Sequence, residues 1–338
     1  MQKQVVALTL LLSTFIPLKA AAKNFDQLYV FGDSLSDTGN LYKLTKDQIP
    51  LTPPYFKGRF SNGPVWVETL GTKLKIPTAA TKNFAVGGAT TTKTNSLNQL
   101  LGVQLPSLPT QLNTFGSTVS KPSPNALYVL WVGANDYLIL PKEKRTTNTQ
   151  VVVNRISNSV NQLIAEGART IVVVNLPDLG KLPQEKALAT SSAVSGVTKR
   201  HNRNLNKALQ TLAQQNRKVK IVPVDVNSLL NRVVANPKKY GFTNLSDSCL
   251  GNPKCTNPNQ YLYWDNIHPS ARAHKLIGEY ALKQVVNTPS GAVSQASIGL
   301  NAENGQLLAI DPIMTIFPSK LNLPFVQQVS IFNNSNFG

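Results

Sequence analysis

The chain has 338 residues, 41% of them hydrophobic, which is enough for one large core. Its formal net charge is +18, but the basic residues lie in short scattered groups without interleaved aromatic side chains, which argues against a nucleic-acid-binding protein. After residue 22, no apolar stretch has the length of a membrane-spanning helix.

The first 22 residues have the pattern of a targeting segment. Lys3 precedes an apolar run at residues 5–16, and three alanines at 20–22 offer a small-residue cleavage site. This order is typical of a secretory signal peptide, and an uncleaved membrane anchor is the alternative. We therefore predict a signal peptide at 1–22 and a mature protein that is secreted, periplasmic or extracellular.

Apolar runs that fit buried strands alternate with helical patterns along the chain. Strands are expected at 27–32, 126–133, 169–177 and 219–225, with a weaker one just before residues 83–88. Helices are expected at 64–74, 148–168, 198–216 and 270–286, with Pro64 and Pro269 suited to first helical turns. This alternation predicts an α/β fold with a parallel sheet covered by helices on both faces.

The core domain is expected to span residues 23–287. Residues 288–338 hold only three charged side chains and are rich in Asn, Ser, Gln, Gly and Pro. This C-terminal extension either adds strands to the core or serves as a sorting or interaction segment, and the sequence leaves both open.

The chain has two cysteines, Cys249 and Cys255, and the five residues between them include a glycine and a proline. In an oxidising compartment such a pair predicts a small local disulfide. Two thiols without a nearby histidine make a poor zinc site, so no metal is expected.

Ser34 follows the first expected strand, at the sheet edge where the sites of parallel α/β proteins form. A serine hydroxyl needs a base to become a nucleophile. His201 and His274 lie within helical patterns, whereas His268 lies in a loop before a helix. Asp265 precedes His268 by three residues, a spacing that allows the carboxylate to hold one ring nitrogen while the other takes the serine proton. We therefore predict Ser34, His268 and Asp265 as a catalytic triad.

A serine hydrolase also needs hydrogen-bond donors for the oxyanion. Gly87 and Gly88 form one candidate loop, and Asn135 follows the strand expected at 126–133. Asp136 is a weaker candidate than Asp265 for the triad acid, because it lacks the three-residue spacing to a histidine. Three polar neighbours of Ser34 are expected to shape its turn through backbone hydrogen bonds: Asp33, Asp37 and Asn40.

Four stretches resemble blocks of the GDSL-type, or SGNH, hydrolase family: FGDSLSDTGN (31–40), NFAVGG (83–88), GAND (133–136) and DNIHP (265–269). The resemblance covers residues 25–286 and implies a three-layer α/β/α, flavodoxin-like fold with a mostly parallel sheet of about five strands. It implies Ser34 as the nucleophile, His268 as the general base and acid, and Asp265 as the group that orients it. It also implies an oxyanion hole of Ser34, Gly88 and Asn135, with Gly87 as the less fitting glycine.

Residues 58–68 and 175–183 also resemble a subgroup that contains plant GDSL lipases and secreted bacterial phospholipases and haemolysins. Together with the predicted export, the resemblance implies a secreted lipase or esterase, including phospholipase A or lysophospholipase activity, without a cofactor. We also expect a monomer. Its partners would be a lipid ester and, through the positive charge, an anionic membrane surface. The alternatives are a carbohydrate O-acetyl esterase, an acyltransferase, or an inert extracellular binding protein.

Overall fold

The computed structural model describes residues 24–138 and 148–288 of the chain. The predicted signal peptide and nearly all of the C-terminal extension lie outside the described residues. Within the described part, no helix is long and apolar enough to cross a membrane.

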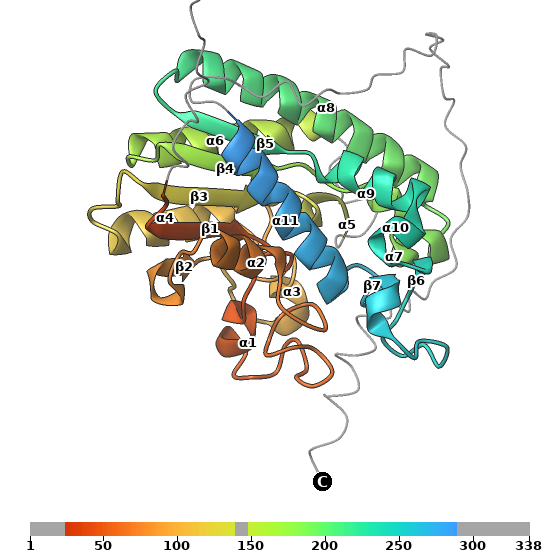
Figure 1. Ribbon diagram of the computed structural model, residues 1–338. Helices are drawn as coiled ribbons and strands as arrows, with labels where there is room; N and C mark the ends of the chain where they lie inside the picture. Colours follow the sequence, from red (N-terminus) through yellow and green to blue (C-terminus); the bar gives the residue numbers. More distant parts are fainter. Residues whose placement is uncertain (1–23, 139–147, 289–338) are drawn as a thin grey trace, which may run out of the picture.

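A five-stranded parallel sheet forms the centre of the molecule, with the strand order β2-β1-β3-β4-β5 (Figure 1). Its strands are β1 (Gln27–Gly32), β2 (Thr81–Asn83), β3 (Ala126–Trp131), β4 (Thr170–Val174) and β5 (Lys220–Val224). The expected strands are confirmed, because continuous apolar runs are what a sheet buried on both faces requires. β3 and β4 consist entirely of buried residues.

Helices cover both faces of this sheet, so the α/β expectation is confirmed (Figure 1). The helices α2, α9 and α11 pack together on one face, and α4, α6 and α8 pack on the other. The longer helices are α2 (Trp66–Lys73), α4 (Leu108–Thr118), α6 (Thr149–Ala165), α8 (Ser191–Gln215), α9 (Val226–Ala235) and α11 (Ala271–Asn287). The shorter helices are α1 (Asn40–Leu44), α3 (Asn98–Leu101), α5 (Asn135–Leu138), α7 (Pro183–Ala187) and α10 (Pro237–Tyr240).

Two details of the helix predictions are wrong. The helix expected at 198–216 begins at Ser191, seven residues earlier, in a small and polar stretch with little apolar periodicity. The two prolines lie before the first turns of their helices, because Val65 is the N-cap residue of α2 and Ser270 that of α11. The Ser270 hydroxyl accepts a hydrogen bond from the Ala273 amide, so a cap side chain, not Pro269, marks the start of α11.

A second, two-stranded sheet lies beside the main one. It consists of β6 (Asn244–Ser248) and β7 (Tyr261–Tyr263), and the predicted disulfide lies in the loop between them. The loop that carries Asp265 and His268 follows β7 directly, so this small sheet leads the chain back to the edge of the main sheet.

The predicted nucleophile Ser34 and the predicted donor Asn135 follow β1 and β3, the two neighbouring strands between which the strand order reverses. These two strands are paired in register, with Gly32 opposite Trp131, so they end level at the same edge. Gly32 has a φ of 151°, and a Cβ atom there would lie 2.2 Å from the Trp131 carbonyl oxygen, which excludes any larger residue. The loops after β1 and β3 therefore leave the sheet side by side, as the switch-point rule for such sheets predicts.

Candidate active site

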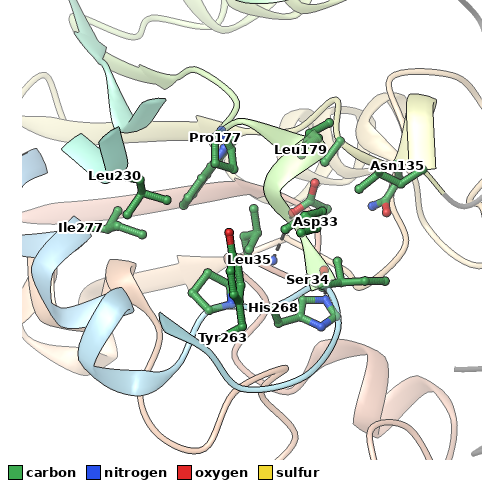
Figure 2. A pocket seen from close by; sticks show the side chains of 16 residues that line it. Asp33, Ser34, Leu35, Asn135, Pro177, Leu179, Leu230, Tyr263, His268 and Ile277 are labelled. Carbon is green, nitrogen blue, oxygen red and sulfur yellow. Dashed lines mark hydrogen bonds between the residues drawn. The ribbon is translucent and has the colours of Figure 1, made fainter. Parts of the chain in front are cut away.

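Ser34 lies at the start of a tight turn that follows β1. The amides of Ser36 and Asp37 both donate to the Asp33 carbonyl oxygen at 3.0 Å, and the Leu35 amide donates to the Asp33 side chain at 3.1 Å. These bonds close the turn and leave the Ser34 hydroxyl outside it, where it lines a pocket (Figure 2). The turn-forming role expected of Asp33 is confirmed.

His268 and Asp265 form a continuous chain of hydrogen bonds with Ser34. His268 Nε2 lies 2.8 Å from Ser34 Oγ, and His268 Nδ1 lies 2.7 Å from Asp265 Oδ2. The other carboxylate oxygen, Asp265 Oδ1, accepts the backbone N–H groups of Ile267 at 2.8 Å and His268 at 2.7 Å. The three side chains thus come from the loop after β1 and the loop after β7, and are brought together by the fold.

The environment of Asp265 favours its ionised form. Burial acts to raise the pKa of this carboxyl, but the charge and hydrogen bond of His268 and the two backbone N–H groups outweigh it and hold the pKa below its ordinary value. Asp265 is therefore a carboxylate at neutral pH, in position to accept a hydrogen bond from the Nδ1–H group and leave Nε2 facing the serine.

The loops that carry the candidate donors are tied to one another. Asn135, at the start of α5, lines the same pocket as Ser34, and its Nδ2 atom donates one hydrogen bond to the Ala89 carbonyl oxygen at 3.0 Å. This bond places the glycine loop next to Asn135, and the second Nδ2 hydrogen has no acceptor among the described residues. Gly88 does not line the pocket among the described residues, and its φ of 76° requires a glycine.

The backbone amides of Gly87 and Gly88 differ in their hydrogen bonds. The Gly87 amide donates to Asp37 Oδ2 at 2.8 Å, so it is already bonded. The Gly88 amide has no hydrogen-bond acceptor among the described residues. Of the two glycine amides, that of Gly87 is thus occupied and that of Gly88 is not.

Asp37 holds the nucleophile loop and the glycine loop together. Its carboxylate accepts backbone N–H groups from Gly39, Asn40 and Leu41 in addition to that of Gly87, at 2.6–3.0 Å. The Asn40 side chain spans the same two loops by donating to the carbonyl oxygens of Asn83 and Ala85. The expected backbone roles of Asp37 and Asn40 are thus confirmed.

Among the described residues, Asp136 makes no hydrogen bond to His268 and bonds to Thr91 instead. Its two carboxylate oxygens accept the backbone N–H of Thr91 at 3.0 Å and the hydroxyl of Thr91 at 2.7 Å. It therefore fixes the loop after β2 against the first turn of α5, a structural role that no feature of the sequence indicates.

Asp33 combines full burial with an unsatisfied oxygen. The residue is 1% exposed, and Oδ2 has no hydrogen-bond partner among the described residues. Burial raises the pKa of Asp33 to about 7; the Leu35 amide and His268 act in the opposite direction, and Asp136 adds to the rise.

We expect Asp33 to make the folded protein less stable as the pH rises from about 4 to about 7. An unfolded aspartate has a pKa near 3.9, so over this range the unfolded chain has lost a proton that the folded chain keeps. The free energy of unfolding then falls by up to about 1.4 kcal/mol per pH unit from this group alone. Urea unfolding of the wild type and of Asp33→Asn at pH 5 and pH 8 tests this. The stability of the variant relative to the wild type should rise with pH, and a pH-independent difference would contradict the expectation.

The pocket beside Ser34 is lined mainly by apolar side chains (Figure 2). Leu179 and Leu182 come from the segment after β4, Leu230 from α9, and Ile277 from α11. In Figure 2, Leu230 and Ile277 lie at the end of the pocket away from Ser34 and Asn135. Sequence reasoning did not identify this pocket, because its walls come from segments far apart in the chain whose apolar residues look like ordinary core.

A further residue at the site was missed by sequence reasoning. The hydroxyl of Tyr55 donates a hydrogen bond to Asp265 Oδ2 at 2.7 Å, the same oxygen that faces His268. Tyr55 lies 210 residues before Asp265 in the chain, and no spacing or motif in the sequence links the two.

The two cysteines are joined in the structure, with a sequence separation of 6. The Cys249 amide donates to the carbonyl oxygens of Tyr263 and Trp264, directly before Asp265. The disulfide therefore closes a small loop that is bonded to the start of the loop that carries Asp265 and His268. Among the described residues, no group of three His, Cys, Asp or Glu side chains is arranged to hold a metal ion.

Replacing both cysteines by alanine is expected to lower the free energy of unfolding by about 2 kcal/mol, the entropic effect of opening so short a loop. Urea unfolding under oxidising conditions measures this, and wild type treated with dithiothreitol is the matched control. The reduced wild type and the double variant should unfold at similar urea concentrations. A double variant as stable as the oxidised wild type would show that the bond is dispensable.

Comparison with known proteins adds a family and several relatives. The family model described as GDSL-like lipase/acylhydrolase matches residues 28–281. A phosphatidylcholine-sterol acyltransferase of Aeromonas hydrophila is 33% identical over 254 residues, which cover 74% of this chain and 73% of that protein. A GDSL esterase/lipase of Arabidopsis thaliana is 28% identical, covering 82% of this chain and 88% of that protein. A thermolabile hemolysin of Vibrio parahaemolyticus is 26% identical, covering 78% of this chain and 64% of that protein.

Proposed function

Since the chain belongs to the GDSL-like lipase/acylhydrolase family and is a carboxylic ester hydrolase, we propose that it cleaves lipid esters through an acyl intermediate on Ser34. The observation that carries this proposal is the hydrogen-bonded chain from Ser34 through His268 to Asp265 at one end of an apolar pocket. A serine alone is a poor nucleophile, and this chain supplies the base and the group that orients the base.

In the first half of the reaction, Ser34 Oγ attacks the ester carbonyl carbon and its proton passes to His268 Nε2, 2.8 Å away. Asp265 stabilises the imidazolium that forms. The carbon–oxygen bond to the alcohol then breaks, and His268 gives its proton to the departing alcohol. The acyl group remains on Ser34.

In the second half, a water molecule attacks the acyl-Ser34 ester and gives a proton to His268. The bond to Ser34 Oγ breaks, His268 returns the proton to that oxygen, and the carboxylic acid leaves. In both halves, negative charge develops on the carbonyl oxygen. The donors we assign to that charge are the Ser34 amide and the second Nδ2 hydrogen of Asn135, which line the pocket, and the Gly88 amide, which has no acceptor among the described residues.

The apolar lining of the pocket favours an apolar acyl group as the substrate. Burial of apolar surface contributes about 0.8 kcal/mol per methylene group, so walls of leucine, isoleucine and proline favour fatty acyl chains. We therefore prefer a lipid esterase over a carbohydrate O-acetyl esterase as the function of this protein.

A series of p-nitrophenyl esters from acetate to palmitate, run beside phosphatidylcholine and lysophosphatidylcholine, tests the proposal. We expect kcat/KM to rise with chain length from acetate to at least octanoate, and free fatty acid to appear from at least one of the two lipids. Leu230→Trp, at the end of the pocket away from Ser34, should move the preference toward shorter chains. A preference for acetate with no release from either lipid would contradict the proposal.

Acyl transfer is the second candidate, because the relative from Aeromonas hydrophila is a phosphatidylcholine-sterol acyltransferase. In that reaction an alcohol takes the place of water in the second half, and the product is a new ester. Supplying cholesterol with phosphatidylcholine and measuring cholesteryl ester against free fatty acid separates the two activities.

Export from the cytoplasm is the third part of the proposal. The Cys249–Cys255 bond supports it, because structural disulfides persist in oxidising compartments. The net charge of +18 supports attraction to anionic lipid surfaces, which would decrease as salt screens it. The proposed substrate and the proposed location thus agree with each other.

A further inference from the structure

Residues 55–62, here termed the brace segment, contact the loop that carries Asp265 and His268 at several points. The Phe60 ring packs on the His268 ring with a centroid distance of 5.0 Å. The Ser61 hydroxyl donates to the Pro269 carbonyl oxygen at 3.0 Å, and Asn62 accepts the Ala271 amide at 2.8 Å. The brace segment thus fixes both the ring of His268 and the backbone that follows it.

Tyr55 is the member of the brace segment that contacts the triad through a polar atom. Its hydroxyl lies 2.7 Å from Asp265 Oδ2, and the residue is 6% exposed. Burial, followed by the charge and hydrogen bond of Asp265, raises the pKa of Tyr55 far above its ordinary value. The phenol is therefore neutral, so it donates the hydrogen and the carboxylate accepts it.

The Tyr55 hydroxyl is one of four hydrogen-bond donors to the Asp265 carboxylate. Oδ1 accepts two backbone N–H groups, and Oδ2 accepts Tyr55 and the Nδ1–H of His268. Four donors around one carboxylate leave it little freedom to rotate. They also spread its negative charge, which lowers its basicity toward His268.

Tyr55 is itself held by the small disulfide-linked sheet. Its ring packs edge-on against Trp264 with a centroid distance of 6.2 Å, and both belong to one buried cluster with Cys249 and Tyr261. Tyr55 does not line the pocket beside Ser34 among the described residues. Its effect on the reaction would therefore pass through Asp265 and not through contact with substrate.

We propose that Tyr55 is a positioning residue of this active site, whose phenol holds the Asp265 carboxylate in the orientation that His268 requires. The inference rests on the proposed function, because it assigns a role at the same site. The brace segment carries none of the predicted catalytic residues, and its role in this proposal is to hold Asp265 and His268 in place.

Tyr55→Phe removes the hydroxyl and keeps the ring, so it tests the inference with little change in packing. We expect kcat to fall about three- to tenfold and KM to stay unchanged, since the lost bond orients the base without touching substrate. The carboxylate loses a donor and becomes more basic toward His268. The acidic limb of the pH profile of kcat/KM should therefore move up by about half a pH unit.

Two other groups that interact electrostatically with His268 are retained in this variant, namely Asp33 after β1 and His274 on α11. Burial, with a contribution from His268, lowers the pKa of His274 to about 3, so it stays neutral over the pH range of the assay. Asp33, with a pKa of about 7, titrates in the assay range in both proteins, so a difference in the acidic limb between the wild type and Tyr55→Phe reports the loss of the bond to Asp265.

Tyr261→Phe is the matched control. Tyr261 lies in the same buried cluster, and among the described residues its side chain makes no hydrogen bond to Asp265, so the kinetics and pH profile of Tyr261→Phe should match the wild type. A double-mutant cycle with Asp265→Ala gives the decisive comparison, because Tyr55→Phe should have almost no further effect once the carboxylate is gone.

Unchanged kinetics and an unchanged pH profile in Tyr55→Phe would overturn the inference. An equal loss of kcat in the wild-type and Asp265→Ala backgrounds would also overturn it, because the role would then be structural. Failure of the proposed function is distinguishable, since in that case Ser34→Ala would keep full activity whatever Tyr55→Phe does.

Discussion

Ser34→Ala is expected to reduce kcat/KM for esters by at least about 10⁴-fold while the protein remains folded. The variant lacks the atom that forms the acyl intermediate, and His268 and Asp265 without a nucleophile leave only the donors and the pocket. The hydroxyl contacts His268 Nε2, so its removal costs at most about one ordinary hydrogen bond of stability. Hydrolysis of p-nitrophenyl octanoate and a thermal unfolding curve measure the two quantities.

Ser36→Ala is the matched control for this experiment. Ser36 lies in the same turn, is fully buried, and accepts a hydrogen bond from Trp66 Nε1 at 3.0 Å. Its loss leaves a buried indole N–H without a partner and should cost about 1–3 kcal/mol of stability, with the nucleophile intact. Activity that survives in Ser34→Ala but disappears in Ser36→Ala would reverse the assignment.

Asn135→Ala is expected to lower kcat by about 10²- to 10³-fold with little change in KM. The Asn135 side chain lines the pocket beside Ser34, and one of its Nδ2 hydrogens is free of the bond to Ala89. A neutral donor at this position acts on charge that develops in the transition state and contributes much less to substrate binding.

Asp136→Asn is a suitable comparison for Asn135→Ala. Asp136 fixes the same loops through Thr91 and lies outside the pocket lining among the described residues. We expect it to affect stability more than kcat. A loss below tenfold in Asn135→Ala, or an equal loss of kcat in both variants, would give Asn135 a structural role instead.

Elements with a strong local signal could be predicted from the sequence. β1 was predicted with its observed bounds, because a continuous apolar run ends at a glycine that only fits beside Trp131. The helix expected at 270–286 was placed to within one residue at each end. The beginning of α8 could not be predicted, because its first turns are small and polar and are held by contacts with the segment after β4.

The same distinction, between residues with a local sequence signal and residues without one, applies to the candidate active site. Ser34, His268 and Asp265 could be singled out because each lies in a short stretch with a characteristic spacing, and the structure brings these three together. The choice between Gly87 and Gly88 depends on which amide Asp37 occupies, and that is a tertiary contact. Tyr55 gives no signal in the sequence, because a single tyrosine becomes relevant only through a contact 210 residues away.

The most direct test of the account is covalent labelling of Ser34 by a fluorophosphonate probe, located by mass spectrometry of the digested protein. The probe needs an activated serine, so the wild type should carry it on Ser34 and His268→Ala should react at least about 10²-fold more slowly. Labelling of a different residue, or equal labelling rates in the wild type and His268→Ala, would contradict the claim that His268 activates Ser34 as the nucleophile.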